Sequence, residues 1–378
     1  MQSDVGAWIM NIAVDIRCLM DNQITGVGEY TFELLKALLE KDNSNQYYLF
    51  YNSAKKVSVP EFNKSNAHYV KFSYPNKLLN LMMTVFKYPK LDSLINKRVK
   101  QNIDLFIFPN IGFVNCSCPY IITCHDLSYK IFPRFFTLKS QLWHKIVNPK
   151  RLFSRAKKVI AVSQNTKDDL MSIYKLSSEK VEVIHSGLSS IYKVLDKSDP
   201  GKEIVRNKYK LPNEFYLYLG TLEPRKNIET LIDAFSKIKS DKHLVIAGKP
   251  GWKFREILKK SKHNKNVHIV NYVDTEDKVY IYNMAHSFVF PSYYEGFGFP
   301  PLEAMACGLP VISSHTAALP GILKQAPIYI NPYNVNDCVQ AMKILDNQIV
   351  YQRSQIKSLK LVEKYSWNDT AINLIKVF

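Results

Sequence analysis

Two carboxylates bracket the segment of this chain whose residue types are best suited to chemistry. Glu295 and Glu303 are separated by seven residues, and Gly296 and Gly298 leave the backbone between them open to close approach. Two prolines follow and predict the start of a short helix, which Gly308 would end. This pattern places backbone N–H groups beside carboxylates that can accept hydrogen bonds from hydroxyl groups. A tight turn with a solvated glutamate is the alternative, but it does not explain an acid on each side.

Two adjacent cations form a second candidate site. Arg225 and Lys226 lie between a predicted strand at residues 215–220 and the helical pattern of NIETLIDAFSKI. Two cations at such a position can hold a diphosphate and stabilise the charge that develops when it departs, a task that other enzymes give to Mg²⁺. The alternative is a solvated basic turn, because most charged side chains lie on protein surfaces.

Two more turns follow predicted strands. Gly26 and Gly28 precede a helical pattern, so backbone N–H groups and a helix N-terminus can approach an anion there. Glycines at a helix start are also common as simple turn formers, and the third glycine of a GxGxxG motif is missing. His125 ends a predicted strand beside Asp126, where it serves either as a structural residue or in catalysis.

The elements that must position these residues alternate between short apolar runs and helical patterns. The apolar runs show continuous hydrophobicity, which is typical of parallel strands covered on both faces. In the first half of the chain the predicted strands are residues 12–17, 47–52, 104–109, 120–125, 158–163 and 181–187. In the second half they are residues 215–220, 243–248, 268–273, 288–292 and 310–314.

Two successive series of this kind predict an α/β protein with two doubly wound, Rossmann-like domains. Residues 195–213 interrupt the pattern with charge, Pro and Gly, and therefore predict the boundary. We expect an N-terminal domain at residues 1–197, a second domain at 198–355, and an amphipathic C-terminal helix at 356–378 that packs as a strap. Ligands of such sheets bind at the carboxyl ends of the strands, where the four candidate turns lie.

The net charge of the chain is +18, from 51 Lys and Arg against 33 Asp and Glu. Residues 51–158 hold 19 of these cations and only 4 acids, so the excess is regional. A basic region suits nucleic acid, an anionic membrane surface or a phosphorylated substrate. Residues 76–90 and 132–158 mix large apolar side chains with Lys and Arg, as segments that rest on anionic lipid do. Ordinary core packing of helices is an equally good explanation of these two segments.

The cysteines and the N-terminus favour a reducing cytoplasm. The six cysteines include no CxxC pair, and the chain does not begin with a basic stretch followed by an apolar core. Cys116, Cys118, Cys124 and His125 could be grouped as a metal cluster, but zinc sites prefer CxxC-type spacing, so we expect no metal. No apolar run reaches the roughly 18 residues of a membrane-spanning helix, so membrane contact would be peripheral.

Taken together, these motifs resemble those of the retaining glycosyltransferases of family 4, which have the two-domain GT-B fold. EGFGFPPLEAMACGLPVI resembles the Glu-x₇-Glu signature of that family. The resemblance covers nearly the whole chain through TGVGEYTFELL, TCHDLSY, VIAVSQNTKDDL, VEVIHSG, LGTLEPRKN, LVIAG and YSWNDTA. It implies that the two domains face each other across a cleft, with the acceptor bound by the first and a nucleotide-sugar by the second.

The resemblance also implies a role for each candidate residue of the second domain. Glu303 would bind the ribose hydroxyls, while Arg225 and Lys226 would clamp the diphosphate. Glu295 would lie close to the reacting sugar, and the sugar would be held by backbone at Gly296, Phe297 and Gly298. Many family members have Arg directly after the glycine that ends the strand, whereas this chain has Thr221 there. The diphosphate would therefore depend more heavily on the two adjacent cations.

The remaining roles that the resemblance implies concern the base and the first domain. The backbone near Tyr272 and Val273 would meet the base. Gly26 and Gly28 would contact the diphosphate from the opposite domain, and His125 would point at the transferred sugar.

The reaction implied by the resemblance transfers a sugar from a nucleoside diphosphate to a hydroxyl with retention at the anomeric carbon. The chain contains no Asp-x-Asp, which is consistent with cations replacing a metal, so we expect no metal and no cofactor. LGTLEPRKN is similar to mannosyl-transferring members that build bacterial surface polysaccharides, so GDP-mannose is the expected donor. A lipid-linked glycan is the expected acceptor, used by a cytoplasmic enzyme at the inner face of the membrane.

Three alternatives stay open at this point. The first is transfer of glucose or N-acetylglucosamine from a UDP-sugar. The second is a nucleotide-sugar 2-epimerase, which shares the architecture but fits the Glu-x₇-Glu context less well. The third is a nucleic-acid-binding protein, which the charge alone suggests, since the sequence has no zinc finger, recognition helix or aromatic-basic motif.

Overall fold

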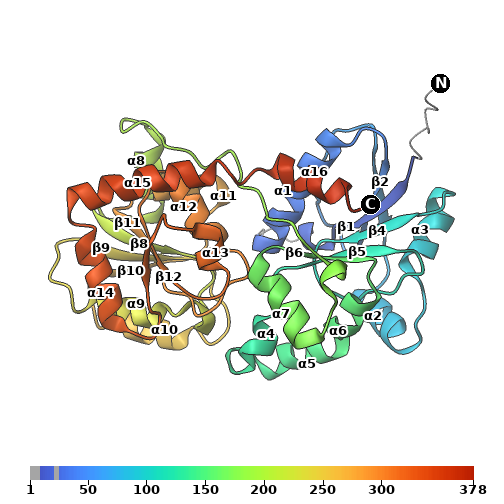
Figure 1. Cartoon of the computed structure of the whole chain (residues 1–378), viewed down its shortest axis with the longest axis horizontal. Coiled ribbons are helices and arrows are strands. Elements are labelled where there is room, and N and C mark those ends of the chain that lie inside the picture. Colours follow the sequence, from blue (N-terminus) through green and yellow to red (C-terminus); the bar gives the residue numbers. More distant parts are fainter. Residues whose placement is uncertain (1–8, 21–24) are drawn as a thin grey trace. The chain divides into compact units, whose positions relative to one another are not determined.

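The computed structural model describes residues 9–20 and 25–378 and divides the chain into two compact units (Figure 1). The first unit comprises the chain up to Leu127 together with Leu138–Gly187 and Ser366–Phe378. The second unit comprises Ser128–Thr137 and Leu188–Tyr365. The very start of the chain, which contributed to the prediction of a cytoplasmic compartment, lies outside the described residues.

The first unit is built on a seven-stranded parallel sheet in the order β3-β2-β1-β4-β5-β6-β7. Its strands are β1 Asn11–Asp15, β2 Gln46–Asn52, β3 Ala67–Phe72, β4 Leu105–Phe108, β5 Tyr120–Cys124, β6 Lys158–Ala161 and β7 Val181–Val183. Val14 of β1 pairs with Leu49 of β2 on one side and with Ile107 of β4 on the other. The central strands are buried on both faces, which explains their continuous hydrophobicity.

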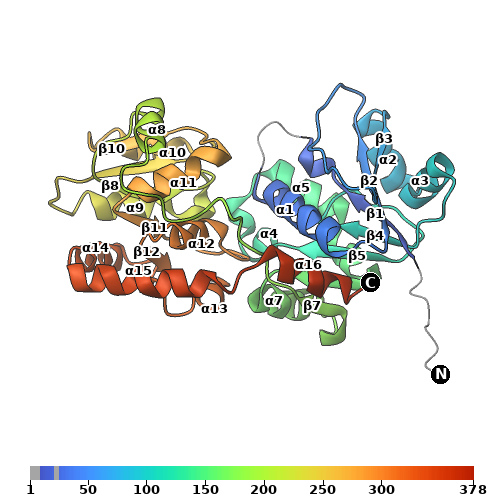
Figure 2. The same cartoon turned by 90° about the horizontal axis from the view of Figure 1, so that it is seen from above.

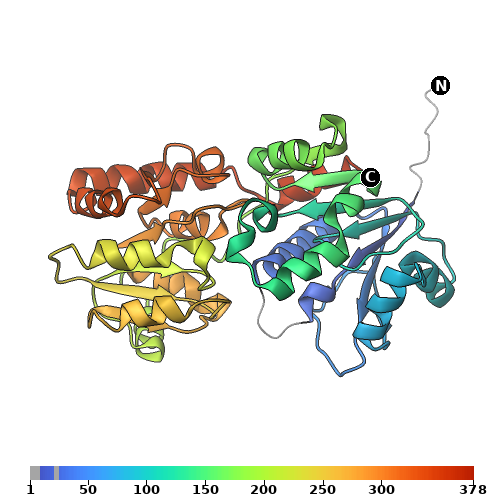
Figure 3. The ribbon, with the colours of Figure 1, turned by 90° about the horizontal axis from the view of Figure 1, so that it is seen from below.

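Helices cover both faces of this sheet (Figures 1 and 3). Their bounds are η1 Arg17–Leu19, α1 Gly26–Lys41, α2 Asn76–Val85, α3 Leu91–Val99, α5 Leu138–Val147, α6 Pro149–Arg155, α7 Gln164–Tyr174, η3 Ser178–Lys180 and α16 Trp367–Ile375. The three- and four-residue spacing of leucines predicts α1 correctly, since Leu34, Leu35, Leu38 and Leu39 are all buried. The last helix, α16, packs against α1.

The second unit has a six-stranded parallel sheet in the order β10-β9-β8-β11-β12-β13. Its strands are β8 Phe215–Leu219, β9 His243–Ala247, β10 Val267–Val270, β11 Ser287–Phe290, β12 Val311–Ser314 and β13 Ile328–Ile330. Its helices are α4 Ser128–Ile131, η2 Pro133–Phe135, α8 Gly201–Tyr209, η4 Pro224–Lys226, α9 Ile228–Phe235, α10 Arg255–Ser261, α11 Thr275–Met284, α12 Phe299–Ala306, α13 Leu319–Leu323, α14 Val335–Ile344 and α15 Gln348–Val362.

The prediction of two doubly wound α/β domains is confirmed, and each predicted strand is present. Two strands were missed, β3 and β13, and each lies at an edge of its sheet. An edge strand is covered less completely than a central one, so its sequence carries a weaker apolar signal. In β3 only Val70 is fully buried, and β13 is three residues long.

The boundary falls earlier than the sequence predicts. The second unit begins at Leu188, whereas residues 1–197 were expected to form the first domain. Part of the predicted linker forms α8, which buries Val205 and packs against α11. The composition was misleading because none of the four charged side chains of α8 is buried, so that its sequence looks like a solvated linker. The segment Ser128–Thr137 also joins the second unit, where Phe135 stacks on Tyr293 with ring centroids 5.6 Å apart.

The closing segment is two helices and not the single strap predicted at residues 356–378. Figure 2 shows α15 and α16 as separate helices. The chain between them ends at Ser366, whose side chain caps α16 by accepting from the backbone N–H of Asp369. α15 belongs to the second unit, while α16 returns to the first, where Thr370 Oγ1 donates to the backbone oxygen of His185 at 2.8 Å. A serine able to start a new helix is the local reason for the break.

Candidate functional site

The candidate residues of the second unit gather at the carboxyl ends of its strands. Arg225 and Lys226 lie in η4 after β8, and Tyr272 with the buried Val273 follows β10. Glu295 and the glycines after it lie between β11 and α12. Because all strands of this sheet are parallel, these turns share one edge of it, as the sequence predicts.

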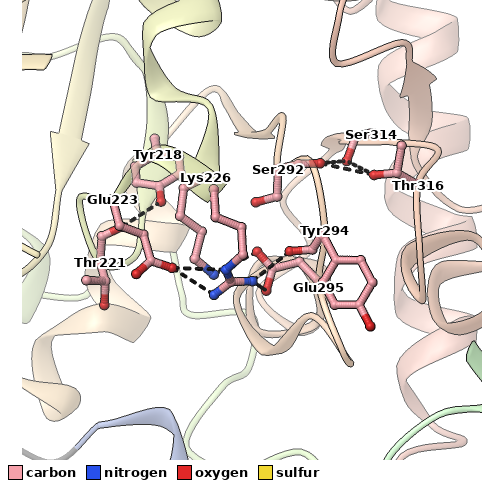
Figure 4. Close-up of polar contacts among 10 residues, drawn as sticks. Tyr218, Thr221, Glu223, Lys226, Ser292, Tyr294, Glu295, Ser314 and Thr316 are labelled. Carbon is pink, nitrogen blue, oxygen red and sulfur yellow. Dashed lines mark hydrogen bonds and ion pairs between the residues drawn. The ribbon is translucent and has the colours of Figure 1, made fainter. Parts of the chain in front are cut away.

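Three of these side chains are in direct contact (Figure 4). Arg225 Nη1 donates to Glu295 Oε2 at 2.9 Å, and Lys226 Nζ donates to Glu295 Oε1 at 2.7 Å. The same Arg225 nitrogen donates to the backbone oxygen of Tyr294 at 2.6 Å. Lys226 Nζ also lies 5.3 Å from the centroid of the Phe290 ring. The structure therefore joins the two motifs that the sequence analysis treated as separate sites.

A further carboxylate, Glu223, orients the guanidinium. Glu223 Oε1 accepts from Arg225 Nε at 3.1 Å and from Nη2 at 2.8 Å. The side chains of Arg225 and Lys226 are 12% and 11% exposed, so the alternative of a solvated basic turn is wrong. Sequence reasoning missed Glu223, although an acid two residues before an arginine in LEPRK signals a local ion pair.

Glu295 is charged across the whole physiological pH range. Burial on its own would raise the pKa of this carboxyl, but the adjacent Arg225 and Lys226 outweigh burial and lower the pKa to about 2. The alternative of a solvated glutamate in a tight turn is therefore also wrong. The carboxylate is a permanent anion that holds two cations at the end of the sheet.

Asn227 connects three of the strand-end turns. Its backbone has φ of 55°, a left-handed conformation that asparagine tolerates better than most residues. Its Nδ2 donates to the backbone oxygens of Pro291 at 3.0 Å and Pro332 at 2.7 Å. The backbone N–H of Tyr293 donates to the oxygen of Arg225 at 2.9 Å. These bonds hold the Arg225 turn against the Glu295 turn, a role that the sequence analysis did not assign.

The loop that carries Glu295 is fixed at both ends, by Gly298 before α12 and by hydrogen bonds to Ser292 after β11. Gly298 has φ of 100°, and a Cβ there would lie 2.7 Å from Leu319 Cδ2, so this position requires glycine. α12 begins immediately afterwards, with proline in its first turn as predicted. Ser314, the last residue of β12, and Thr316, two residues later, donate to the backbone oxygen of Ser292 at 2.5 Å and 3.1 Å (Figure 4).

The second glutamate of the signature has a different environment. Glu303 is buried within α12, and its Oε2 accepts from the hydroxyl of Tyr282 at 2.8 Å. Burial, reinforced by the nearby carboxylate, raises the pKa of Tyr282 well above its usual value, so the hydroxyl keeps its proton. The two signature carboxylates thus have separate partners, and Tyr282 had not been identified from the sequence.

In the first unit, His125 is held at the end of β5. Its Nε2–H donates to the backbone oxygen of Pro109 at 2.8 Å. Its ring packs edge-on against the Tyr30 ring, with the ring centroids 4.7 Å apart. Burial lowers the pKa of His125, although the bond to Pro109 and the charge of Asp126 oppose this. The ring is therefore neutral near pH 7, with its proton on Nε2.

The glycines near the N-terminus lie inside the first turn of α1. Gly26 is its first residue, and a Cβ at this position would meet no atom within 4 Å. Gly28 is buried two residues later. Among the described residues, neither steric crowding nor a left-handed backbone requires glycine at position 26.

Two further properties of the described residues concern groups that could bind a metal ion and helices that could span a membrane. Within residues 9–20 and 25–378, no group of three or more His, Cys, Asp and Glu side chains could hold a metal ion. The sulfur of Cys116 lies near the backbone oxygen of Cys118 at 3.7 Å. None of the described helices combines the length and hydrophobicity needed to cross a membrane.

Two family models match this chain. Residues 24–190 match Glycosyltransferase Family 4, and residues 201–358 match Glycosyl transferases group 1. With these two matches and its two Rossmann-like sheets, the chain belongs to the glycosyltransferases of GT-B fold. The resemblance seen in the sequence motifs is therefore confirmed.

Particular relatives extend this comparison. O-antigen chain mannosyltransferase B of Escherichia coli is 26% identical over 374 residues, which cover 94% of this chain and 96% of that protein. Serotype-specific mannosyltransferase WbdA of Escherichia coli is 26% identical over 408 aligned residues, 98% of this chain. The chain spans about half of WbdA, 48% of its length. Among solved structures, sucrose-phosphate synthase from Thermosynechococcus elongatus has a TM-score of 0.76 at 19% identity, over 97% of this chain and 98% of that one.

Proposed function

We propose that this protein transfers mannose from GDP-mannose to a hydroxyl of a lipid-linked glycan, with retention at the anomeric carbon and without a metal ion. The observation that carries this proposal is the buried cluster of Arg225, Lys226 and Glu295 at the end of the second sheet. It lies in the part of the chain that matches Glycosyl transferases group 1. Two cations fixed beside a carboxylate suit a diphosphate next to a sugar.

The choice of mannose and of a glycan acceptor is supported by the relatives. The O-antigen chain mannosyltransferase B of Escherichia coli matches this chain over nearly its full length, and WbdA is also named a mannosyltransferase. Transfer of glucose or N-acetylglucosamine from a UDP-sugar is the second candidate, carried over from the sequence.

In the proposed reaction, the bond between the anomeric carbon and the diphosphate oxygen breaks, and the acceptor oxygen bonds to the same face. The acceptor proton passes to the departing phosphate, so no pair of opposed carboxylates is needed. Arg225 and Lys226 stabilise the negative charge that grows on the diphosphate. Glu295 orients both cations and lies beside the reacting sugar, and Glu303, held by Tyr282, binds the ribose.

The remaining site residues complete the proposal. Backbone at Gly296, Phe297 and Gly298 holds the sugar, and backbone near Tyr272 and Val273 meets the base. In the first unit, Gly26 and Gly28 open the N-terminus of α1 to the diphosphate. His125 contacts the transferred sugar as a neutral imidazole, since burial lowers its pKa.

The proposed setting is the inner face of the cell membrane, with the basic stretch of residues 51–158 drawn to anionic lipid. Its 19 Lys and Arg against 4 acids give the required charge. A lipid-linked acceptor is presented at such a surface, so an enzyme that binds there meets its acceptor.

Thermal unfolding in the presence of GDP-, UDP- and ADP-sugars tests the donor. We expect GDP-mannose to raise the unfolding midpoint most, since a ligand at 100 times its Kd stabilises a protein by about 2.7 kcal/mol. A larger rise of the unfolding midpoint with a UDP-sugar would show that the donor is that UDP-sugar and not GDP-mannose. Release of UDP with an inverted free sugar and no acceptor would indicate the epimerase, and tight, sequence-specific nucleic-acid binding at physiological salt would overturn the enzyme proposal.

A further inference from the structure

Two helices of the first unit carry apolar side chains that are exposed to solvent. α2 buries Leu79 and Met83 and turns its other face outward. The exposed apolar residues of α2 and its following turn are Leu78, Leu81, Val85, Phe86 and Tyr88. Val85 and Phe86 are 59% and 65% exposed, so packing inside the domain does not account for them.

α5 shows the same feature. Leu138, Leu142 and Ile146 follow one another at intervals of four residues, which places them on one face of the helix. All three are exposed, Leu142 by 57%. The sequence left core packing and lipid contact equally open for residues 76–90 and 132–158. For these side chains, the structure excludes core packing.

Residues from both helices line one pocket. It has a volume of about 170 Å³ and is lined by the ends of α2 and α5 and by α6. Its cationic lining residues are Lys87, Lys145, Arg151 and Arg155, and Ile146 of the exposed α5 row also lines it. Figure 1 shows α2, α5 and α6 along one side of the sheet of this unit, with α1 on the other. Four cations therefore line a pocket together with Ile146, one of the exposed apolar residues of α5.

These cations have no acidic counterpart nearby in the sequence. Residues 76–100 and 138–158 contain thirteen Lys and Arg but one acid, Asp92. Asp92 is buried and accepts from the hydroxyl of Ser117 at 2.5 Å and from its backbone N–H at 2.9 Å. In the described part of the chain, none of the four cationic pocket residues forms a salt bridge.

We propose that this pocket binds the headgroup phosphate of an anionic phospholipid at a membrane surface, while the exposed residues of α2 and α5 enter the edge of the hydrocarbon. Arg151 and Arg155, one helical turn apart, suit a phosphate because guanidinium groups bind it with paired hydrogen bonds. Basic clusters beside apolar helical faces bind anionic lipid. Nucleic acid fits less well, because its phosphate backbone makes no apolar contacts with exposed leucine and isoleucine side chains.

This inference rests on the proposed function, since it names the surface by which the enzyme reaches its lipid-linked acceptor. It is tested by co-sedimentation of the full chain with phosphatidylcholine vesicles that contain or lack phosphatidylglycerol. We expect binding only with phosphatidylglycerol. The variant Arg151→Gln/Arg155→Gln should lower the affinity roughly 30-fold if both cations contact lipid.

The matched control for charge is Lys36→Gln/Lys41→Gln, which removes the same charge from α1, outside the pocket. We expect it to change the affinity less than about threefold. The apolar contact is tested by Val85→Ser/Phe86→Ser, with at least about tenfold weaker binding expected. Its control is Ile204→Ser, which removes an equally exposed apolar side chain from α8.

Equal losses in the two charge variants would overturn the pocket in favour of general charge attraction. Binding that ignores phosphatidylglycerol, or that survives Arg151→Gln/Arg155→Gln, would also overturn it. Unfolding midpoints with and without GDP-mannose, measured on the same variants, separate this inference from the proposed function. A protein that binds vesicles through the pocket but no nucleotide-sugar contradicts only the proposed function. One that binds the donor but no vesicles contradicts the inference and the proposed membrane setting, but not the proposed transfer reaction.

Discussion

Lys226 and Glu295 form a buried ion pair in which Nζ lies 2.7 Å from Oε1. The two residues are 69 positions apart and meet because each follows a central strand, β8 or β11, and these strands pair directly. A cation placed to bind a diphosphate is thus already held by a carboxylate of the protein. The electrostatics of the proposed donor site therefore depend on this pair and on Arg225 beside it.

Neutralising Glu295 should disturb both stability and catalysis. Glu295→Gln leaves Arg225 and Lys226 buried without their shared anion, and breaking a buried pair costs up to about 3–5 kcal/mol. We expect a lower urea midpoint and transfer slowed at least about tenfold, or about 1.4 kcal/mol. The control is Glu276→Gln, since Glu276 is exposed on α11 and should tolerate the change. Equal stability of the two variants would contradict the role of Glu295.

The same carboxylate should make stability depend on acid pH. The pKa of Glu295 is about 2 in the folded protein and 4.5 without these interactions, so its contribution is fully present above pH 4.5. It is lost as pH falls towards 2, because the unfolded chain then takes up the proton more readily. The full contribution is about 3 kcal/mol. Urea unfolding between pH 6 and pH 3 should show the wild type losing its advantage over Glu295→Gln as the pH falls, and a constant difference would disprove it.

Asn227 should stabilise the protein in two separate ways, through its side-chain hydrogen bonds and through its tolerance of a left-handed backbone. Asn227→Gly keeps the left-handed backbone but leaves two buried carbonyl oxygens without their donor, at a cost of about 2 kcal/mol. Asn227→Ala should be less stable than Asn227→Gly by about 1 kcal/mol, because alanine strains this conformation. Chemical denaturation measures both. If Asn227→Gly matched the wild type, the hydrogen bonds would have no part in holding the turn.

Two glycines of the first unit should respond in opposite ways to alanine. A Cβ at Gly187 would lie 2.1 Å from the backbone nitrogen of Trp367, so Gly187→Ala must push α16 away, at a cost of about 1–3 kcal/mol. Gly26→Ala meets no atom and should leave the unfolding midpoint unchanged or higher. If the proposed function is right, Gly26→Ala would weaken donor binding even though the unfolding midpoint is not lowered. Equal midpoints for the two variants would contradict the close approach of Trp367.

Removal of divalent ions should leave the proposed transfer intact. Arg225 and Lys226 supply the positive charge at the diphosphate, so we expect unchanged turnover of GDP-mannose in EDTA. Lys226→Met should lower turnover under both conditions, because it removes one of these charges. Turnover that EDTA abolishes and Mg²⁺ restores would show that the cations do not replace a metal.

The fold could be predicted in large part because its signals are local. Each central strand is a short apolar run, and the leucine spacing of α1 repeats every three or four residues. The predictions were wrong where composition and burial disagree. α8 is charged on its exposed face and still buries Val205, and the edge strand β3 is too poorly covered to look like the others. Ser366 divides the closing segment into two helices that pack in different units.

The sequence by itself identified the motifs around Arg225, Lys226 and Glu295 and the edge of the sheet at which they lie. Residue type and spacing carry that information, because a strand end followed by a turn is a local pattern. Only the tertiary structure decided that the cations and the carboxylate form one buried cluster, which Glu223 and Asn227 hold in place. It also decided that the hydroxyl of Tyr282 donates a hydrogen bond to Glu303. These contacts join residues distant in the chain through the pairing of parallel strands, which no local pattern records.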